Sequence, residues 1–441
     1  MIQLLSFATI AIVAILSIKG LRRPGVMLAL LWSTYAIEQV AQQGASFLLV
    51  RSWLMNVALA GMTLLAVFRA FLSGKTKGFS PTTAHVLIGG LFLQCILSYT
   101  WSIAPSDTYY ILTKNAPYIF AFAVLAPFCA LNYREVDTAI KTIVHFGAIL
   151  LIVLAFSEYG KNGRGVVLQL ADGRLAEANP LAAATFGGYV SICAIFYMYT
   201  KRSQPTLQKA FYSVIILLGV FVIIRSGSRG QLIALFASSL LWLPITAKVA
   251  AKRSSIIAVA IAGVIAIGSW FYVSNSGSYR WDLDTVSDSG SGRIAQTLFV
   301  IESMLEEGPS AWILGLGNSA SYSLIGGYPH NVPGEVLAEE GILGFMLYLG
   351  FMISVALTGL NYMRKSEVHP ESRVSVGVLL ALFTFEFLVG LKQGSFIGSP
   401  AIIGVGLCVV NSIQMMKRDA KSSRLKAVNA IYASQLREPI Y

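Results

Sequence analysis

A histidine, two carboxylates and the expected start of a helix come together between residues 328 and 344. Asn331 is a suitable N-cap and a proline follows two positions later, so the spacing predicts a helix that begins directly after His330. Glu335 and Glu339 are four residues apart and would share one face near the positive end of that helix. His330 could therefore act as a base beside a bound anion, or it could be a surface histidine at a helix start.

Arginines form the second group that could do chemistry. Arg225 and Arg229 occupy a tight break between two apolar segments, in the sequence Ile-Arg-Ser-Gly-Ser-Arg-Gly-Gln. The glycines permit close backbone approach and the serines add donors, which suits a phosphate. Arg174 and Arg293 add positive charge on the same predicted side, and guanidinium groups bind phosphoryl oxygens in bidentate fashion. The alternative for Arg225 is a side chain that extends to lipid headgroups.

The composition excludes an ordinary soluble protein. Of 441 residues, 56% are hydrophobic and only 12% are charged, about half the charged fraction of a typical soluble domain. The net charge of +12 comes from short basic clusters between apolar segments, which indicates membrane topology and not a nucleic-acid partner. The four cysteines all lie within apolar segments, so we expect packing residues and neither a disulfide nor a metal site.

Long apolar segments recur along the chain, separated by polar loops. A spanning helix needs about 17 to 25 residues, and about thirteen segments meet this length. The sequence therefore predicts an all-α polytopic integral membrane protein with about 12 to 14 transmembrane helices. The expected spans cover residues 2–18, 25–42, 52–72, 84–100, 116–132, 139–157, 180–200, 209–225, 231–247, 254–274, 341–363, 374–391 and 397–416.

Basic clusters fall in alternate loops, and the positive-inside rule places those loops in the cytoplasm. The basic tail 417–441 is then cytoplasmic, where an amphipathic helix could lie on the anionic leaflet. The remaining loops face the periplasm, and the longest, 275–340, is the expected functional feature. We treat residues 1–441 as a single membrane domain that contains this loop.

Within the long loop, the segment from Arg293 to Glu307 carries apolar residues at helical spacing. This pattern predicts a short amphipathic helix that lies on or just above the bilayer and roofs a cavity. The apolar positions are Ile294, Leu298, Ile301 and Leu305.

A pair of glycines and two glutamates within expected spans could also be functional. Gly315-x-Gly317 has no strand before it, so we interpret it as a turn and not as a dinucleotide site. Glu38 and Glu386 lie within expected spans, where they could belong to a proton path or make hydrogen bonds between helices.

Four short patterns, taken in order, resemble the O-antigen ligase and polymerase family of membrane glycosyltransferases. The resemblance covers about residues 150 to 350 and departs from the family pattern at Pro333-Gly334. It rests on Gly173-Arg174 followed by Asn179-Pro180; on Ser228-Arg229-Gly230; on Ser291-Gly292-Arg293 followed by Gly315 and Gly317; and on His330-Asn331 followed by Leu337, Glu339, Gly341 and Gly344.

The resemblance implies an all-helical fold of the GT-C kind in the bacterial inner membrane, with its active site on the periplasmic side. It implies a glycan donor linked to undecaprenyl diphosphate and an inverting reaction that needs neither metal nor cofactor. In this interpretation His330 accepts or orients the proton of the attacking hydroxyl. Arg229, Arg293 and Arg174 hold the diphosphate, while Glu339 either fixes the imidazole or supports the helix.

Two acceptors and one other class of protein remain as alternatives. A polymerase would transfer the glycan to another lipid-linked repeat unit, which we favour, whereas a ligase would transfer it to the core sugar of lipid A. A flippase of the same lipid-linked glycan also fits many helices around a cationic cavity. It predicts symmetric repeats and charges near the bilayer midplane, whereas the candidate residues here gather at the outer face.

Overall fold

The structure is a computed structural model. It describes residues 2–44, 47–51, 53–76, 79–157, 166–169, 175–200, 205–247, 263, 283–365 and 369–435.

Nine helices in the described part of the chain are long and apolar enough to cross a membrane, which confirms a multi-pass, predominantly helical membrane protein. α10 and α18 are the most buried of these, so they form the centre of the bundle. The nine are Trp53–Leu72 (α5), Thr83–Thr100 (α6, Thr83–Leu97, plus the 3-10 turn Ser98–Thr100), Pro105–Cys129 (α7, Pro105–Ile119, the π-helical turn Phe120–Leu125, and α8, Ala126–Cys129), Tyr133–Phe156 (α9), Pro180–Thr200 (α10), Thr206–Arg225 (α11), Arg229–Ala247 (α12), Val332–Arg364 (α17) and Pro370–Gly390 (α18).

The remaining expected spans do not each form one separate helix. The first is α1 (Ile2–Gly20), and the second is divided at Ser33 into α2 (Pro24–Trp32) and α3 (Thr34–Gly44). α3 carries Glu38 and three glutamines, so it is much less apolar than a spanning helix. The short α4 (Phe47–Val50) follows, and the last expected span begins α19 (Ala401–Gln435). The span expected at 254–274 lies outside the described residues, apart from residue 263.

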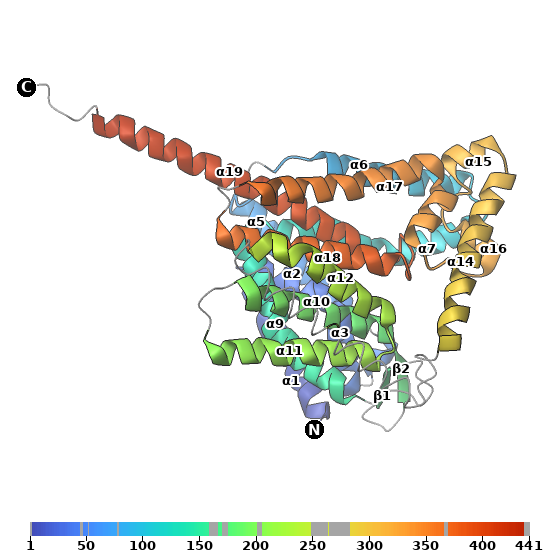
Figure 1. The fold of residues 1–441 in the computed structure, drawn as a ribbon, viewed down its shortest axis with the longest axis horizontal. Coiled ribbons are helices and arrows are strands. Elements are labelled where there is room, and N and C mark those ends of the chain that lie inside the picture. The colour runs from blue at the N-terminus through green and yellow to red at the C-terminus, as the bar shows by residue number, and fades with distance from the viewer. Residues whose placement is uncertain are drawn as a thin grey trace, which may run out of the picture.

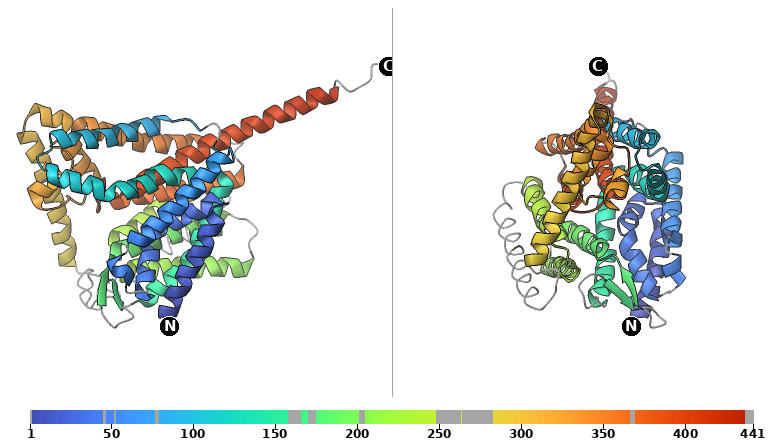
Figure 2. Two further views of the ribbon diagram at one scale, coloured as in Figure 1. Left: turned by 180° about the vertical axis from the view of Figure 1, so that it is seen from behind. Right: turned by 90° about the vertical axis from the view of Figure 1, so that its right-hand side faces the viewer.

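Short elements cover one end of the bundle. α14 (Leu283–Glu306) runs across the ends of the long helices, with α15 (Pro309–Leu314) and α16 (Ala320–Ile325) beside it (Figure 1). We call this the α14 end, and α19 extends from the opposite side in both Figure 1 and Figure 2. An antiparallel pair, β1 (Val166–Gln169) and β2 (Leu175–Ala178), was not expected in an all-α chain and pairs Val166 with Ala178.

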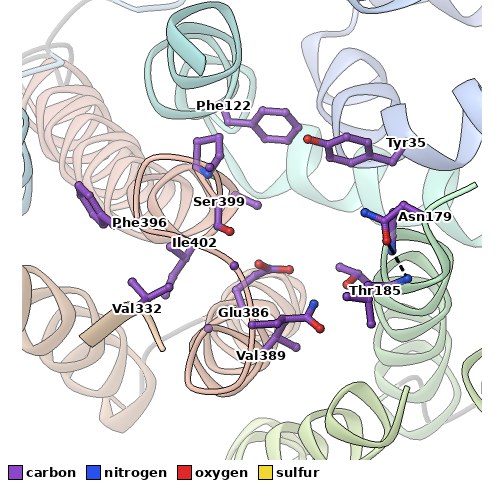
Figure 3. Close-up of a pocket in the computed structure, with 18 of the residues that line it drawn as sticks. Tyr35, Phe122, Asn179, Thr185, Val332, Glu386, Val389, Phe396, Ser399 and Ile402 are labelled. Atoms are coloured by element: carbon purple, nitrogen blue, oxygen red, sulfur yellow. Dashed lines mark hydrogen bonds between the residues drawn. The ribbon is translucent and has the colours of Figure 1, made fainter. Parts of the chain in front are cut away.

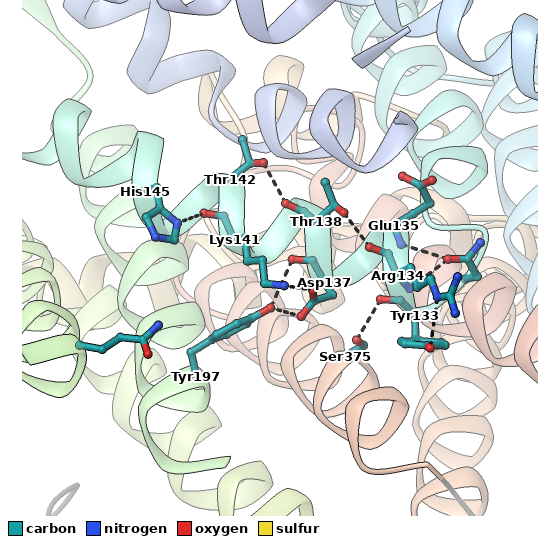
Figure 4. A network of polar contacts seen from close by, with 12 residues as sticks. Tyr133, Arg134, Glu135, Asp137, Thr138, Lys141, Thr142, His145, Tyr197 and Ser375 are labelled. Atoms are coloured by element: carbon teal, nitrogen blue, oxygen red, sulfur yellow. Dashed lines mark hydrogen bonds and ion pairs between the residues drawn. The ribbon is translucent and has the colours of Figure 1, made fainter. Parts of the chain in front are cut away.

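A polar network joins three central helices at the opposite end (Figure 4). The Tyr197 hydroxyl on α10 donates to the Asp137 carboxylate on α9, which also forms a salt bridge of 2.5 Å with Lys141. Ser375 on α18 donates to the carbonyl oxygen of Tyr133, 3.3 Å away. Together these contacts tie the two innermost helices to α9. The four cysteines are buried and unpaired, as expected of packing residues.

α17 breaks at Gly341, whose φ of 66° is left-handed. The break frees two carbonyl oxygens, and the loop after α15 satisfies both: Leu316 N donates to Ala338 O (3.0 Å) and Gly317 N donates to Glu339 O (2.9 Å). A Cβ atom on Gly315 would lie 2.1 Å from Glu339 O, so only glycine permits this approach. The Gly-x-Gly turn therefore caps the interior of a broken helix.

Replacing Gly341 by alanine should destabilise the protein by about 2 kcal/mol or more, because left-handed backbone is strained for any residue with a Cβ atom. The added Cβ would also lie 2.4 Å from the carbonyl oxygen of Ile313. The measurement is thermal unfolding in detergent. Gly350→Ala on the same helix is the matched control, because its Cβ would meet only the side chain of Leu87 at 3.3 Å or more. Equal melting temperatures for the two variants would contradict the proposed strain.

Candidate functional site

A cavity of about 290 Å³ lies at the α14 end between α10, α18 and the segments that lead into α17 and α19 (Figure 3). One part of its wall is aromatic, and the polar groups that line it come from elements far apart in the sequence. The aromatic lining includes Trp32, Tyr35, Phe122, Phe186, Tyr189 and Phe396; the polar lining includes Asn179, Arg293, His330, Glu386, Gln393 and Ser399.

His330 is fixed by the start of α17. Asn331 is the N-cap, as predicted, and its side-chain oxygen accepts a hydrogen bond from Gly334 N at 3.0 Å. His330 itself has a left-handed φ of 59°, a conformation in which histidine is enriched relative to most residues. Its ring meets Tyr328 edge to face, with 4.5 Å between the ring centroids. The backbone thus turns the imidazole toward the cavity while the helix begins behind it.

Arg293 reaches the same cavity from α14. One guanidinium nitrogen donates to the carbonyl oxygen of Lys392 at 3.1 Å, which connects α14 to the loop after α18. One turn later, the Thr297 hydroxyl lies 2.9 Å from the carbonyl oxygen of Arg293 and 3.3 Å from that of Pro329, the residue before His330. Helix α14 is therefore attached to both segments that border the cavity.

The predicted amphipathic helix is part of α14, and two of its faces differ in environment. Ile294 and Leu298, two of the apolar positions expected from the sequence, are exposed, as a helix in contact with lipid would require. The face toward the protein carries Thr297, Val300 and Met304, which are buried. These two apolar positions therefore lie on the exposed face of α14, and a different set of residues packs inward.

Burial lowers the pKa of His330, and the positive charge of Arg293 lowers this pKa further. Both effects disfavour the imidazolium form. The imidazole is consequently neutral at pH 7, which is the form that can accept a proton. The neighbouring hydroxyl of Tyr328 has a raised pKa because it too is removed from water, so it stays protonated.

The two glutamates of the expected site accept hydrogen bonds from neighbouring loops. Glu339 accepts hydrogen bonds from Ser319 N (2.7 Å), Ser321 N (3.0 Å) and the Ser321 hydroxyl (2.5 Å), so it supports the turn before α16. Glu335 accepts a hydrogen bond from Phe396 N at 3.2 Å and holds the loop between α18 and α19. Neither glutamate lines the cavity. Of the two roles considered for Glu339, its contacts match support of the helix.

The expected cluster of arginines is divided in the structure. Arg225 is exposed, donates to the carbonyl oxygen of Ala155 and packs on the Phe221 ring. Arg229 is half-buried at the start of α12 and does not line the cavity. The next residue, Gly230, lies beside the loop that Arg293 also contacts, because a Cβ on Gly230 would be 2.7 Å from the Lys392 ammonium nitrogen. Arg174 lies outside the described residues.

Several residues of the site were missed from the sequence. Lys392 connects the Arg229 segment to Arg293, and Gln393 lines the cavity beside it. Lys392 could have been found from the sequence, because it is a charged residue directly after an apolar span. Glu386 was considered, and its carboxylate accepts a hydrogen bond from Tyr189 at 2.8 Å, which is the expected bond between helices. Its place in the cavity wall could not be inferred from spacing.

Fold and site together define a multi-pass membrane protein in which a histidine and an arginine from different segments share one cavity at the end of the helix bundle. A scan against models of known protein families found no match, and a search of curated proteins found no significant match.

Proposed function

We propose that this protein is an inverting membrane glycosyltransferase. It takes a glycan from undecaprenyl diphosphate on the periplasmic side of the inner membrane and joins it to another lipid-linked repeat unit of a surface polysaccharide. The observation that carries the proposal is the meeting of His330 and Arg293 in one cavity, with His330 in a setting that keeps its imidazole neutral.

The reaction uses each of these groups once. A hydroxyl of the acceptor sugar attacks the anomeric carbon from the side opposite the diphosphate, and the bond from that carbon to the diphosphate oxygen breaks. The neutral imidazole of His330 accepts the hydroxyl proton, which makes the oxygen a better nucleophile. The negative charge that grows on the leaving diphosphate is stabilised by Arg293.

A diphosphate is a suitable anion for this end of the molecule. Arg293 lines the cavity, and the Arg229 segment meets the same loop through Lys392. Guanidinium and ammonium groups can supply the charge neutralisation that a divalent metal supplies in other enzymes, which is why we propose a reaction without metal or cofactor. The aromatic wall offers a surface for sugar rings or for the isoprenoid next to the diphosphate.

The proposal is tested by purified protein in vesicles that contain a lipid-linked repeat unit, with new glycosidic bonds as the measured product. Transbilayer movement of the lipid without new bonds would instead identify a flippase. Deletion of the gene distinguishes the two acceptors. Loss of a polymerase leaves single lipid-linked repeat units, whereas loss of a ligase for the lipid A core leaves long lipid-linked polymer.

The pH dependence of kcat/KM should report the state of His330. Activity requires the neutral imidazole, so it is retained above the lowered pKa of His330 and falls as the pH drops through that value. Replacing Arg293 by glutamine removes one of the two effects that lower the pKa, and the acid limb should therefore move to higher pH. Arg293→Lys keeps the charge and is the control, which should leave the limb in place. If the acid limb of kcat/KM stayed at the same pH in Arg293→Gln, the pH dependence would not arise from His330.

A further inference from the structure

Among the described residues that line the cavity, Glu386 is the one that is acidic, and the reaction above does not use it. It lies on α18 within a spanning segment and is 7% exposed. One carboxylate oxygen accepts the hydrogen bond from the Tyr189 hydroxyl, and the side chain lies at the cavity in Figure 3. Within the described part of the chain, the second oxygen accepts no hydrogen bond, which leaves it for a ligand.

The carboxylate lies deeper in the bundle than the cationic groups. Gly390, the last residue of α18, also lines the cavity, and Glu386 precedes it by one helical turn, about 6 Å along the axis. Arg293 contacts the chain two residues beyond Gly390, at the Lys392 carbonyl oxygen. The cavity therefore has a cationic part near the helix end and an acidic part about one turn inward.

Two more polar atoms of cavity residues are without a hydrogen-bond partner among the described residues. Trp32 Nε1, a donor, and Gln393 Oε1, an acceptor, are both buried and make no hydrogen bond within the described part of the chain. Buried polar groups are normally hydrogen-bonded, so a small rotation of either side chain that turns its atom toward the cavity would give it a partner in a ligand with both donors and acceptors. Sugar hydroxyls are such groups.

Aromatic rings complete the inner part of the cavity. Trp32 meets Tyr189 edge to face with 6.1 Å between ring centroids, and Phe186 lies one turn before Tyr189 on α10. Apolar, aromatic walls with a few fixed polar groups are typical of sites that orient a small polar ligand. A phosphate alone would gain nothing from these rings and would be repelled by Glu386.

We propose that Glu386, Trp32 and Gln393 form a subsite for the sugar directly attached to the diphosphate, with the Glu386 carboxylate accepting hydrogen bonds from its hydroxyl groups. This inference rests on the proposed function, because it assigns the inner part of the same cavity. It makes Glu386 a specificity-determining residue: it contacts the sugar that is transferred and takes no proton in the reaction.

A purely structural role for Glu386 makes a different prediction. If its only task were to accept the hydrogen bond from Tyr189, glutamine would serve as well, since its carbonyl oxygen can accept the same bond. Glu386→Gln therefore keeps the link between α10 and α18 and alters only the atom that is available to a ligand. Tyr189→Phe does the opposite, because it removes the link and keeps the carboxylate.

The test measures binding of three probes to the purified full chain in nanodiscs: farnesyl diphosphate, and farnesyl diphosphate bearing N-acetylglucosamine or galactose. In the unaltered protein at least one glycosylated probe should bind tighter than the bare diphosphate. Glu386→Gln should weaken that probe by about tenfold to a hundredfold, because hydrogen bonds to a charged acceptor are lost, and it should not weaken the bare diphosphate, which the carboxylate repels. Arg293→Gln should weaken all three probes, and Tyr189→Phe should keep most of the preference for sugar.

The outcomes separate the two proposals. Equal binding of all probes by the unaltered protein, or an unchanged sugar preference in Glu386→Gln, would overturn the sugar subsite while the glycosyltransferase proposal stands. Binding of none of the probes would overturn the proposed function and the subsite with it. Melting temperatures of the variants within a few degrees of the parent would show that the bundle is intact.

Discussion

Replacing His330 by asparagine is expected to lower glycosyl transfer by a hundredfold or more. Removal of a general base typically costs a factor of about 100 to 10,000. Asparagine is the informative replacement because it tolerates the left-handed φ of 59° found at this position, so the start of α17 should be preserved. The measurement is the initial rate of bond formation in vesicles with lipid-linked substrate.

Two comparisons show whether the loss is chemical. His330→Asn should bind farnesyl diphosphate as well as the parent does, because Arg293 remains in place. His145→Asn is the matched control, since His145 lies within α9, where its ring bonds to the carbonyl oxygen of Lys141 at 2.7 Å. This control should keep full activity. Full transfer by His330→Asn would remove His330 from the reaction.

Replacing Arg293 by glutamine should have the second largest effect, a loss of transfer of about a hundredfold to a thousandfold. Loss of one group that stabilises a developing negative charge typically has this size. Arg293→Gln also removes charge from the cavity wall, so the Kd for a prenyl diphosphate should rise together with the loss of rate. Transfer rates and binding of farnesyl diphosphate measure the two effects separately.

Arg225→Gln is the matched control for Arg293, because both arginines donate to a backbone carbonyl oxygen at the α14 end. Arg225 is exposed and lies outside the cavity, so its replacement should change the transfer rate by no more than about twofold to threefold, as for a surface side chain. Similar losses in both variants would indicate that positive charge at this end acts at a distance, and the assignment of Arg293 to the leaving group would be wrong.

Helix starts and breaks near the site could be predicted because they depend on interactions between residues close in the sequence. The N-cap at Asn331, the break between α11 and α12, and a helix beginning near Asn179 depend on a few neighbouring residues. The class of protein followed from the apolar segments, whose lengths match a bilayer.

The assembly of the site could not be predicted, because it depends on contacts between distant segments. Glu339 has the spacing of a partner for His330, yet the kink at Gly341 brings Ser319 and Ser321 to its carboxylate. Arg225 and Arg229 are four residues apart, but Arg225 bonds to the carbonyl oxygen of Ala155, whereas Gly230, the residue after Arg229, lies beside Lys392. The spacing of residues predicts which of them share a helix face, but it does not predict which segments pack against that face.

The break in α17 also determines how deep the site lies. After Gly341, residues 342–364 form a straight run of 23 residues, about 35 Å long, close to the thickness of a hydrocarbon core with modest tilt. Ile342, Leu343 and Met346, which follow the break, are exposed, whereas Glu335 and Glu339 before it are enclosed by protein. If the acyl-chain region ends at this break, His330 lies at the height of the phospholipid phosphates. A diphosphate anchored by its own isoprenoid tail would arrive at this height without leaving the leaflet.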